Sequence, residues 1–384
     1  MQFSYKHSVS LSSTIKAWFV GLSLASVFAG TATPVFAQQD FIFGGDARLF
    51  AMGGAGLALM QTRSSRPNPA TLAFERRIPD PTFPTLGFRT SEGMNQDRAG
   101  GYLVAGAKPK DAASLARDFG SNDSVFGLSG ATAFRYGSLE IGASVIARGT
   151  LEPNAALQDW VRNGNRIYES LSPDARGDVF TVGYYNLPSI AYGQMIPAPK
   201  QQSHQVGVGV RLKYMNAFYS HYVADQSALL GLTPANLAPE MNGQERLERT
   251  GLGMDFGVMI QPRKRSGFSA AFVVSNLVKP NFAFEGTDRN GNPFRVDPLA
   301  TTYHAGLGYT SSFGTRVALD VADISGAAGQ RQFRAGIEQR VWGPIYARGG
   351  YNSVTGATYG LGFFGLDVAF GNQIPLEVTQ TLRF

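Results

Sequence analysis

Apolar and polar residues alternate at every second position through much of the chain after residue 80, in segments of about ten residues. Between residues 206 and 214, the even positions hold Val206, Val208, Val210, Leu212 and Tyr214. The odd positions hold Gly207, Gly209, Arg211 and Lys213. A period of two residues predicts β-strands whose side chains point alternately to an apolar face and a polar face. Similar alternation returns at residues 139–148, 254–261, 333–338 and 345–351, so the sequence predicts an all-β fold.

Alternation alone suits a soluble β-sandwich as well as a transmembrane β-barrel, because both have one apolar face. Two features favour an antiparallel transmembrane barrel. The polar positions are rich in glycine and in both signs of charge, as expected of a crowded lumen. The chain also ends on an alternating segment that includes Leu382 and Phe384, and this ending resembles the C-terminal signal of bacterial outer-membrane barrels.

The spacing of turn residues predicts the number of strands, because such barrels have short periplasmic turns, long outer loops and an even strand count. Short turns fall at residues 136–138, 197–202, 262–266, 311–315, 342–344 and 363–365. Longer connections fall between them, at residues 109–123, 151–177, 223–250, 280–298 and 324–330. Counting back from the C-terminus gives about fourteen strands, provided that residues 81–108 supply only one. That segment has two candidates, residues 86–89 and 102–107, and we assign the first to the plug or to a bent extension.

Composition removes several other classes of protein. The chain of 384 residues contains 46 Gly and no Cys, and 43% of its residues are hydrophobic while 16% are charged. This apolar content excludes a disordered chain, and the absence of Cys excludes a disulfide scaffold or a zinc module built on Cys. A helical bundle is disfavoured because each Gly costs on the order of 1 kcal/mol in a helix.

The first residues have the features of an export signal. Lys6 and Lys16 precede an apolar run at residues 17–30, and small residues end the segment at Ala37. The apolar run is shorter than the roughly 20 residues that a membrane-spanning helix needs, so we assign residues 1–37 to a signal peptide. Without the two lysines the net charge falls from +6 to +4, which gives no argument for a nucleic-acid partner.

Residues 38–80 do not alternate, and we assign them to an N-terminal hatch or plug inside a barrel formed by residues 81–384. The small residues from Gly53 to Gly56 allow a close approach of the backbone and positive φ angles. Pro69 pushes Asn68 away from the helical region and starts a turn. Pro69 can then be the first residue of a short helix that includes Ala70.

This stretch resembles the N-terminal hatch of the FadL-type outer-membrane transporters of hydrophobic compounds and of their PorV-like and TraF-like relatives. The matching residues are Arg48, Ala51, Met52, Gly53, Gly54, Ala55, Ala58, Asn68, Pro69 and Ala70. The resemblance implies a bacterial outer-membrane barrel in which movement of the hatch opens a passage without ATP. Arg48, Met52, Gly53, Gly54, Asn68, Pro69 and Ala70 are then the candidate gate residues. The alternative is a plug that folds with the barrel and never moves.

The charged residues on the polar face bear on the ligand. Among them are Arg211, Lys213, Arg148 and Glu140, which we expect to point into the lumen. Positive and negative charges could pair as a structural network. A slightly positive lumen would instead favour anionic amphiphiles such as a fatty carboxylate.

Two motifs resemble ligand sites but fit turns better. Residues 360–365 match the dinucleotide-binding pattern GxGxxG, yet a strand follows where that motif needs a helix. Residues 288–292 begin like a calcium loop but lack its glycine and final glutamate, so we expect an Asn-Gly hairpin tip. We find no catalytic signature, so we expect no enzyme activity, no cofactor and no metal site.

Two functions remain. The first is passive uptake of hydrophobic or amphipathic small molecules across the outer membrane, gated by the hatch. The second is a non-conducting role beside a protein of a secretion or surface-assembly apparatus, as in the PorV-like relatives. A continuous apolar pocket that reaches the hatch would favour the first, and a lumen packed shut would favour the second.

Overall fold

The computed structural model describes residues 47–59, 67–75, 79–90, 124–162, 172–197, 199, 202–224, 245–264, 266–282, 284–287, 293–296, 299–327, 331–371 and 374–380. The predicted signal peptide (1–37), the candidate strand at 102–107 and the C-terminal Leu382 and Phe384 lie outside these residues. The statements below concern the described part of the chain.

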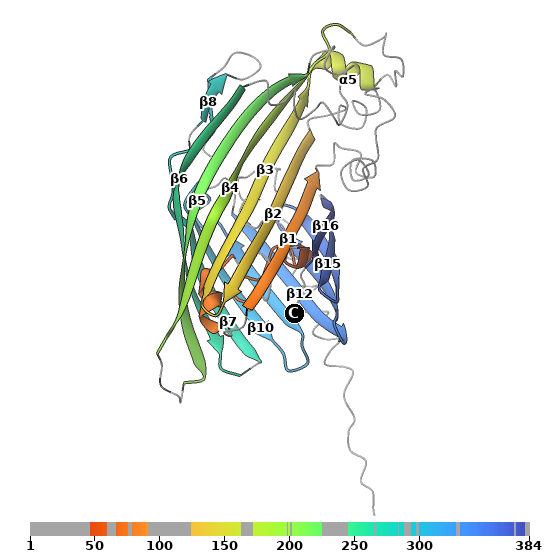
Figure 1. Ribbon diagram of the computed structural model, residues 1–384. Helices are drawn as coiled ribbons and strands as arrows, with labels where there is room; N and C mark the ends of the chain where they lie inside the picture. Colours follow the sequence, from red (N-terminus) through yellow and green to blue (C-terminus); the bar gives the residue numbers. More distant parts are fainter. Residues whose placement is uncertain are drawn as a thin grey trace, which may run out of the picture. The chain divides into compact units, whose positions relative to one another are not determined.

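The chain forms one large antiparallel sheet, so the predicted all-β fold is confirmed (Figure 1). Its strands are β1 Pro79–Thr90, β2 Ser124–Tyr136, β3 Leu139–Pro153, β4 Gly177–Ile196, β5 His204–Ala224, β6 Glu245–Pro262, β7 Gly267–Val278, β10 Thr302–Thr310, β11 Arg316–Ala322, β12 Gln332–Trp342, β13 Ile345–Asn352, β14 Gly356–Phe363, β15 Leu366–Gly371 and β16 Ile374–Gln380. Strands that follow one another in this order pair in space, and β1 pairs both with β2 and with β16. The first and last strands of the sheet are therefore neighbours.

The short turns lie where the sequence predicts them. β2 and β3 meet at Gly137, which has a φ of +58° and so adopts a conformation that glycine takes without steric cost. The GxGxxG pattern at residues 360–365 is the end of β14 and its turn into β15, as predicted. The strands that flank the expected hairpin tip pair as the separate sheet of β8 Phe284–Thr287 and β9 Pro293–Val296, while the tip itself at residues 288–292 lies outside the described residues.

One strand assignment is wrong. Residues 86–89 do not belong to the plug or to a bent extension, because they lie in β1 and pair with both of its neighbours. Leu86 is opposite Gly130 of β2 and Val378 of β16. The strand also begins at Pro79, before the predicted boundary at residue 81. Prolines at 79, 81 and 84 concealed the strand, since proline cannot donate to a ladder and a bulge near Thr82 and Thr85 interrupts the pairing.

The strands differ greatly in length. β4, β5 and β6 have 20, 21 and 18 residues, whereas β11, β15 and β16 have 7, 6 and 7. Figure 1 shows β4 and β5 extending well past the ends of β15 and β16. The long strands therefore carry inward side chains at levels that the short strands do not reach.

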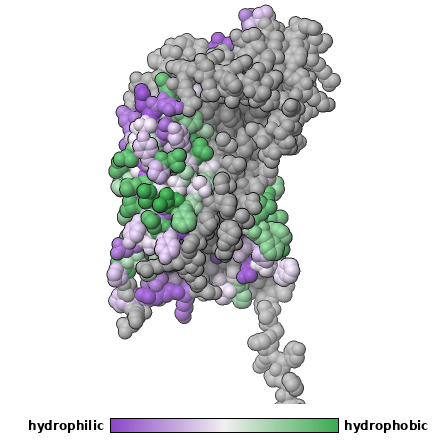
Figure 2. Space-filling view, viewed as in Figure 1, coloured by the Kyte–Doolittle hydropathy of each residue, from purple (hydrophilic) through white to green (hydrophobic). Residues whose placement is uncertain are grey.

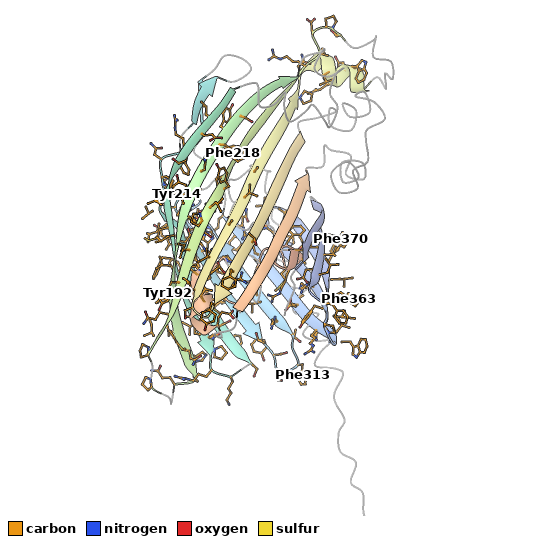
Figure 3. All side chains as sticks on the ribbon, viewed as in Figure 1. Tyr192, Tyr214, Phe218, Phe313, Phe363 and Phe370 are labelled. Atoms are coloured by element: carbon orange, nitrogen blue, oxygen red, sulfur yellow. The ribbon has the colours of Figure 1, made fainter. Side chains whose placement is uncertain are left out.

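The two faces of the sheet have opposite polarity. On the outer face, large apolar side chains are exposed, among them Leu212 at 54% and Leu307 at 60%. Figure 3 shows Tyr192, Tyr214, Phe363 and Phe370 along the outer side, and Figure 2 shows hydrophobic residues gathered between more polar zones. On the inner face, charged side chains such as Arg135, Asp255 and Glu338 are buried. A water-soluble sandwich would show the reverse distribution.

Among the helices of the described residues, none is long and apolar enough to span a membrane.

Two short helical segments pack on the inner face, and we call the described residues 47–59 and 67–75 the plug. Helix α2 (Ala47–Ala51) contacts β13, β14, β15 and β16. The 3₁₀ helix η2 (Pro69–Phe74) contacts β4, β5 and β6. A third helix, α5 (Ala155–Arg162), follows β3 and is capped by Asn154, whose Oδ1 accepts from the Leu157 N–H at 3.0 Å. The plug thus contacts two separate groups of strands on the inner face, β4–β6 and β13–β16.

Glycines on the inner face create the space for the plug backbone. A Cβ built at Gly209 would collide with the Pro69 carbonyl and the Ala70 nitrogen, and one at Gly257 would collide with Asn68 Oδ1. Gly350 has the same relation to Met52 and Gly53. Several glycines of the alternating pattern therefore make room for the plug backbone.

Neighbouring glycines of β13 provide a matched test of this seating. We expect Gly350→Ala to lower the midpoint of thermal unfolding, because overpacking costs about 1–3 kcal/mol. Gly349→Ala should leave the midpoint nearly unchanged, since a Cβ there meets only Ile337 Cγ2 at 3.9 Å. Circular dichroism of the full chain during heating measures both, and equal midpoints for the two variants would contradict the seating.

Candidate functional site

The predicted gate motif Asn68-Pro69-Ala70 forms the start of η2. Asn68 is its N-cap: the Asn68 Oδ1 accepts from the Ala70 N–H at 2.9 Å, and the Thr71 hydroxyl donates to the Asn68 carbonyl at 2.8 Å. Pro69 occupies the first helical position, where its missing N–H costs nothing. The same Asn68 side chain donates to the Val258 carbonyl of β6 at 3.2 Å. One asparagine thus starts the helix and fastens it to the sheet.

The second predicted motif, Met52-Gly53-Gly54, ends helix α2. Gly53 and Gly54 have φ angles of +68° and +77°, so they reverse the chain after the helix as a left-handed C-cap does. The Gly54 N–H donates to the Leu49 carbonyl at 2.8 Å, which closes the helix end. The Gly53 N–H also donates to the Thr358 hydroxyl of β14 at 3.0 Å. The positive φ angles expected from the small-residue run are confirmed at these two positions.

The loop that follows is held by side chains that the sequence did not single out as plug contacts. Asp320 Oδ2 on β11 accepts from the N–H groups of Gly56 and Leu57 at 2.7 and 2.9 Å. The Ser269 hydroxyl of β7 donates to the Ala58 carbonyl at 2.6 Å. These contacts satisfy buried backbone groups that water does not reach. Asp320 and Gly56 are 264 positions apart in the sequence, so no local pattern signalled this contact.

Among the described residues, Arg48 links the plug to the sheet by an ion pair with Glu338 of β12. Arg48 Nε and Nη2 donate to the two carboxylate oxygens at 2.6 and 3.1 Å. Arg316 of β11 and Arg348 of β13 also donate to Glu338, each at 2.8 Å. Arg348 in turn donates to Asp367 at 2.7 Å. We call Arg48, Arg316, Arg348, Glu338 and Asp367 the arginine hub.

The burial of the hub makes its pairing obligatory. Glu338 is 1% exposed, and a carboxylate this deep is stable only if charged and hydrogen-bonded partners replace its water. Arg48 belongs to the plug, while the other four residues belong to four different strands. Alternation predicted the inward placement of Glu338 and Arg348, but only the fold brings them to Arg48, 290 positions away from Glu338 in the sequence.

The predicted inner charges form two further clusters. Glu140 accepts from Arg135 at 2.5 Å and from Arg211 at 3.0 Å. Lys213 donates to Asp255 at 2.7 Å and to Asn276 Oδ1 at 2.8 Å. Glu140 and Arg211 are therefore brought together, whereas Lys213 has other partners. Arg148 lies in β3, but its side chain is outside the described part of the structure.

These pairings favour the structural-network interpretation of the inner charges. Arg211 and Lys213 each have a carboxylate within 3.0 Å, so neither presents an uncompensated positive charge to a ligand. Asp255 also accepts from the Asn276 N–H at 2.8 Å, which joins the second cluster to the end of β7.

The inward residues of β5 divide the interior into three levels. Gly207 and Gly209 lie against η2, and Arg211 and Lys213 form the paired level next to it. Beyond them, Met215, Ala217 and Tyr219 belong to a buried apolar cluster on the long strands. Along β5, successive inward residues therefore contact first the plug, then the ion pairs and then the apolar cluster.

A family model described as the F plasmid transfer operon TraF protein matches residues 126–322, slightly more than half of the chain. The chain belongs to this family. The matched residues begin in β2 and end with β11, so the TraF match covers the long strands and Asp320 but not the plug. No curated protein matches the chain.

Residues 47–380, where the structure describes them, include no group of three or more His, Asp or Glu side chains placed to hold a metal ion. The predicted gate residues meet carbonyl, hydroxyl and carboxylate groups of the sheet instead. The site is thus an interface between plug and sheet, with the arginine hub as its charged part.

The arginine hub predicts which of two substitutions destabilises the protein more. Glu338→Gln should destabilise the protein by about 3–5 kcal/mol, because the buried guanidinium groups of Arg48 and Arg348 and the partly exposed one of Arg316 lose their shared carboxylate. Arg48→Met should cost less, since Arg316 and Arg348 still compensate Glu338. Thermal unfolding measures the order, and limited proteolysis reports whether the plug alone is released.

Arg340→Met is the matched control, because Arg340 is exposed and its side chain donates to the turn carbonyl of Gly343 rather than to a buried carboxylate. If Glu338→Gln were as silent as this control, the hub would have no structural role.

Proposed function

We propose that the chain is a transmembrane β-barrel of about fourteen strands in the bacterial outer membrane, closed at rest by its N-terminal plug. In this proposal it takes up hydrophobic or amphipathic small molecules passively, and the plug is the gate. The observation that carries the proposal is the plug itself, held on a polar inner face by reversible contacts while the outer face exposes apolar side chains. The pairing of β1 with β16 supports closure of the sheet.

The apolar band on the outer face has the height that a bilayer requires. On β5 the outward apolar residues run from Val206 to Tyr214, and the next residue of that parity is Asn216. Nine residues at about 3.4 Å each, tilted by about 40°, span roughly 20–25 Å along the membrane normal. This agrees with the apolar belt of about 25 Å in outer-membrane barrels. Opposite Asn216, β6 carries Thr250, so the polar boundary continues across the pair.

The arrangement of charges supports a plug that can leave. If Arg48 withdraws from Glu338, the carboxylate keeps two arginines as partners in the sheet. The other plug contacts described above are hydrogen bonds, including the two that Asp320 accepts from Gly56 and Leu57, and close packing against glycine. An ion pair exclusive to the plug would bind it more firmly. Because Arg316 and Arg348 also pair with Glu338, withdrawal of Arg48 costs less free energy.

The likeness to FadL-type transporters agrees with this mechanism. Their hatch motif corresponds to residues that here cap η2, end α2 and reach the hub. Ligand would enter from the side of the long strands, pass the apolar cluster and the paired charges, and leave past the displaced plug. No step needs a catalytic group, a cofactor or ATP.

A second candidate is a non-conducting partner of a secretion or surface-assembly apparatus. Two observations favour it: the family is described by a protein of the F plasmid transfer operon, and the plug fits closely against glycines on several strands. In this case the plug would remain in place, and the extended strands β4 to β6 would offer the surface for a partner protein.

A cross-link between plug and sheet separates the two candidates. The chain has no cysteine, so Ala58→Cys and Ser269→Cys, which lie in contact across the interface, create a unique pair. The test measures uptake of a labelled fatty acid or aromatic hydrocarbon by liposomes that hold the protein. We expect the pair joined by a short bis-maleimide to lower uptake at least tenfold, and Arg48→Met to raise it.

Each single-cysteine variant treated with the same reagent is the control for chemical modification. Uptake that is unchanged both by the cross-link and by Arg48→Met would contradict the proposal that the plug is a gate. The partner role would then be the remaining candidate. Electrophoretic mobility before and after heating confirms that every variant is folded.

A further inference from the structure

The band of large apolar side chains on the outer face is much lower on β14 and β15, which we call the short wall, than on β5. On β14 the exposed members run from Tyr359 through Leu361 to Phe363, and on β15 they run from Leu366 to Phe370. Each run covers five residues, which at about 3.4 Å each and a tilt of about 40° span roughly 13 Å. The band on β5 spans roughly 20–25 Å by the same reasoning. The short wall therefore has little more than half of that height.

Aromatic rings mark both edges of the band on the short wall. Tyr359 and Phe370 lie opposite each other at one edge. At the other edge Phe363 meets the turn residue Phe364, which is 71% exposed, with ring centroids 4.6 Å apart. Figure 3 shows Phe363 and Phe370 on the outer side of this wall. Since aromatic girdles mark the two membrane interfaces in outer-membrane barrels, the two interfaces would lie unusually close together here.

The turn between β13 and β14 ends the wall just beyond this band. Asn352 Oδ1 accepts from the Val354 N–H at 2.9 Å. The Ser353 N–H donates to the Phe333 carbonyl of β12 at 3.0 Å, and the Ser353 hydroxyl accepts from the Phe333 N–H at 3.1 Å. Residues 345–371 are described without a gap, so the strands of both hairpins end at this level. A flat bilayer of full thickness would place the polar groups of this turn in hydrocarbon.

Helix α2 of the plug supports the short wall from inside. Phe50 and Ala51 pack with Ala369 of β15, and the Thr358 hydroxyl of β14 donates to the Ala51 carbonyl at 3.2 Å. A Cβ built at Gly360 would collide with Ala51. The wall cannot shift along its strands without loss of these contacts. The membrane, rather than the protein, must therefore adapt to the difference in height.

We propose that the outer face of the short wall is a lipid-binding surface at which the bilayer is locally thinned. The inference rests on the proposed function, because it concerns the membrane around that barrel. Deformation of a bilayer costs little per ångström of mismatch, whereas polar groups left in hydrocarbon cost far more. Lipids beside β14 and β15 therefore shorten the layer until their headgroups reach Tyr359 and Phe364. Beside β5 the bilayer keeps its full thickness.

The chemistry of this surface favours lipid over a protein partner. Within residues 356–371 the charged residue is Asp367, which points inward, is 5% exposed and accepts from Arg348 at 2.7 Å. The outward side chains thus carry no charge with which a protein could be recognised, and protein interfaces normally have a polar rim. The surface also continues into exposed apolar residues of β12, among them Phe333 and Val341 at 41% and 63%. A continuous apolar surface without charge suits acyl chains.

Spin labels on the full chain in dioleoyl-phosphatidylcholine vesicles test the proposal. The chain has no cysteine, so Ala357→Cys, Leu361→Cys and Phe364→Cys each give a unique label beyond, within and below the band. The measurement is the rate of collision with a water-soluble nickel chelate relative to that with oxygen, which concentrates in hydrocarbon. We expect this ratio to be at least fivefold higher at positions 357 and 364 than at position 361. Positions seven residues apart would then bracket the whole hydrocarbon layer.

Leu212→Cys on β5 is the matched control, because Leu212 is exposed within the taller band and its label should collide mainly with oxygen. Oxygen-rich collisions at position 357 or 364 would mean a bilayer of full thickness and would overturn the thinning. Low collision rates with both reagents, or spin–spin broadening that dilution with unlabelled protein removes, would mean coverage by protein or by a second copy and would overturn it equally. Loss of the oxygen-rich signal at position 212 would instead contradict the membrane barrel itself, so the two failures are distinguishable.

Discussion

Buried charge on the inner face is the constraint on which the rest of the structure depends. The strands turn their apolar side chains outward, so their charged side chains are enclosed and must be compensated there. Glu338 meets this requirement with three arginines, Glu140 with two, and Asp255 with Lys213 and an amide N–H. Each cluster joins at least two strands, so the pairing that removes an isolated charge also connects the sheet across its interior.

The same constraint explains how the plug is bound. A chain segment inside the sheet brings its own backbone N–H and carbonyl groups, which must also find partners. Asp320, Thr358 and Ser269 satisfy several of them, while glycines remove the side chains that would keep the plug backbone away. Arg48 then completes the hub without being indispensable to it. The plug can be held firmly and still leave, because residues of the sheet provide most of the positive charge that neutralises Glu338.

Much of the fold could be predicted from the sequence, because strand alternation and short turns are local properties. The turns at residues 136–138 and 363–365, the β8–β9 hairpin and the antiparallel pairing all follow from them. The first strand was misassigned because its prolines weaken the local signal, and only pairing with β2 and β16 reveals it. The motifs around Gly53 and Asn68 were visible as turn chemistry, and their φ angles and caps agree with it.

The sequence by itself determined which residues face inward, because a period of two leaves each side chain only two directions. It therefore placed Glu338, Arg211 and Lys213 on the polar face without knowledge of the fold. Only the tertiary structure decided their partners: Arg48 for Glu338, Glu140 for Arg211, and Asp255 for Lys213. It also decided that Phe282, from the connection after β7, would pack into an apolar cluster with inward residues of the long strands. Such choices depend on strand register and on contacts between residues far apart in the chain, and local periodicity carries no information about either.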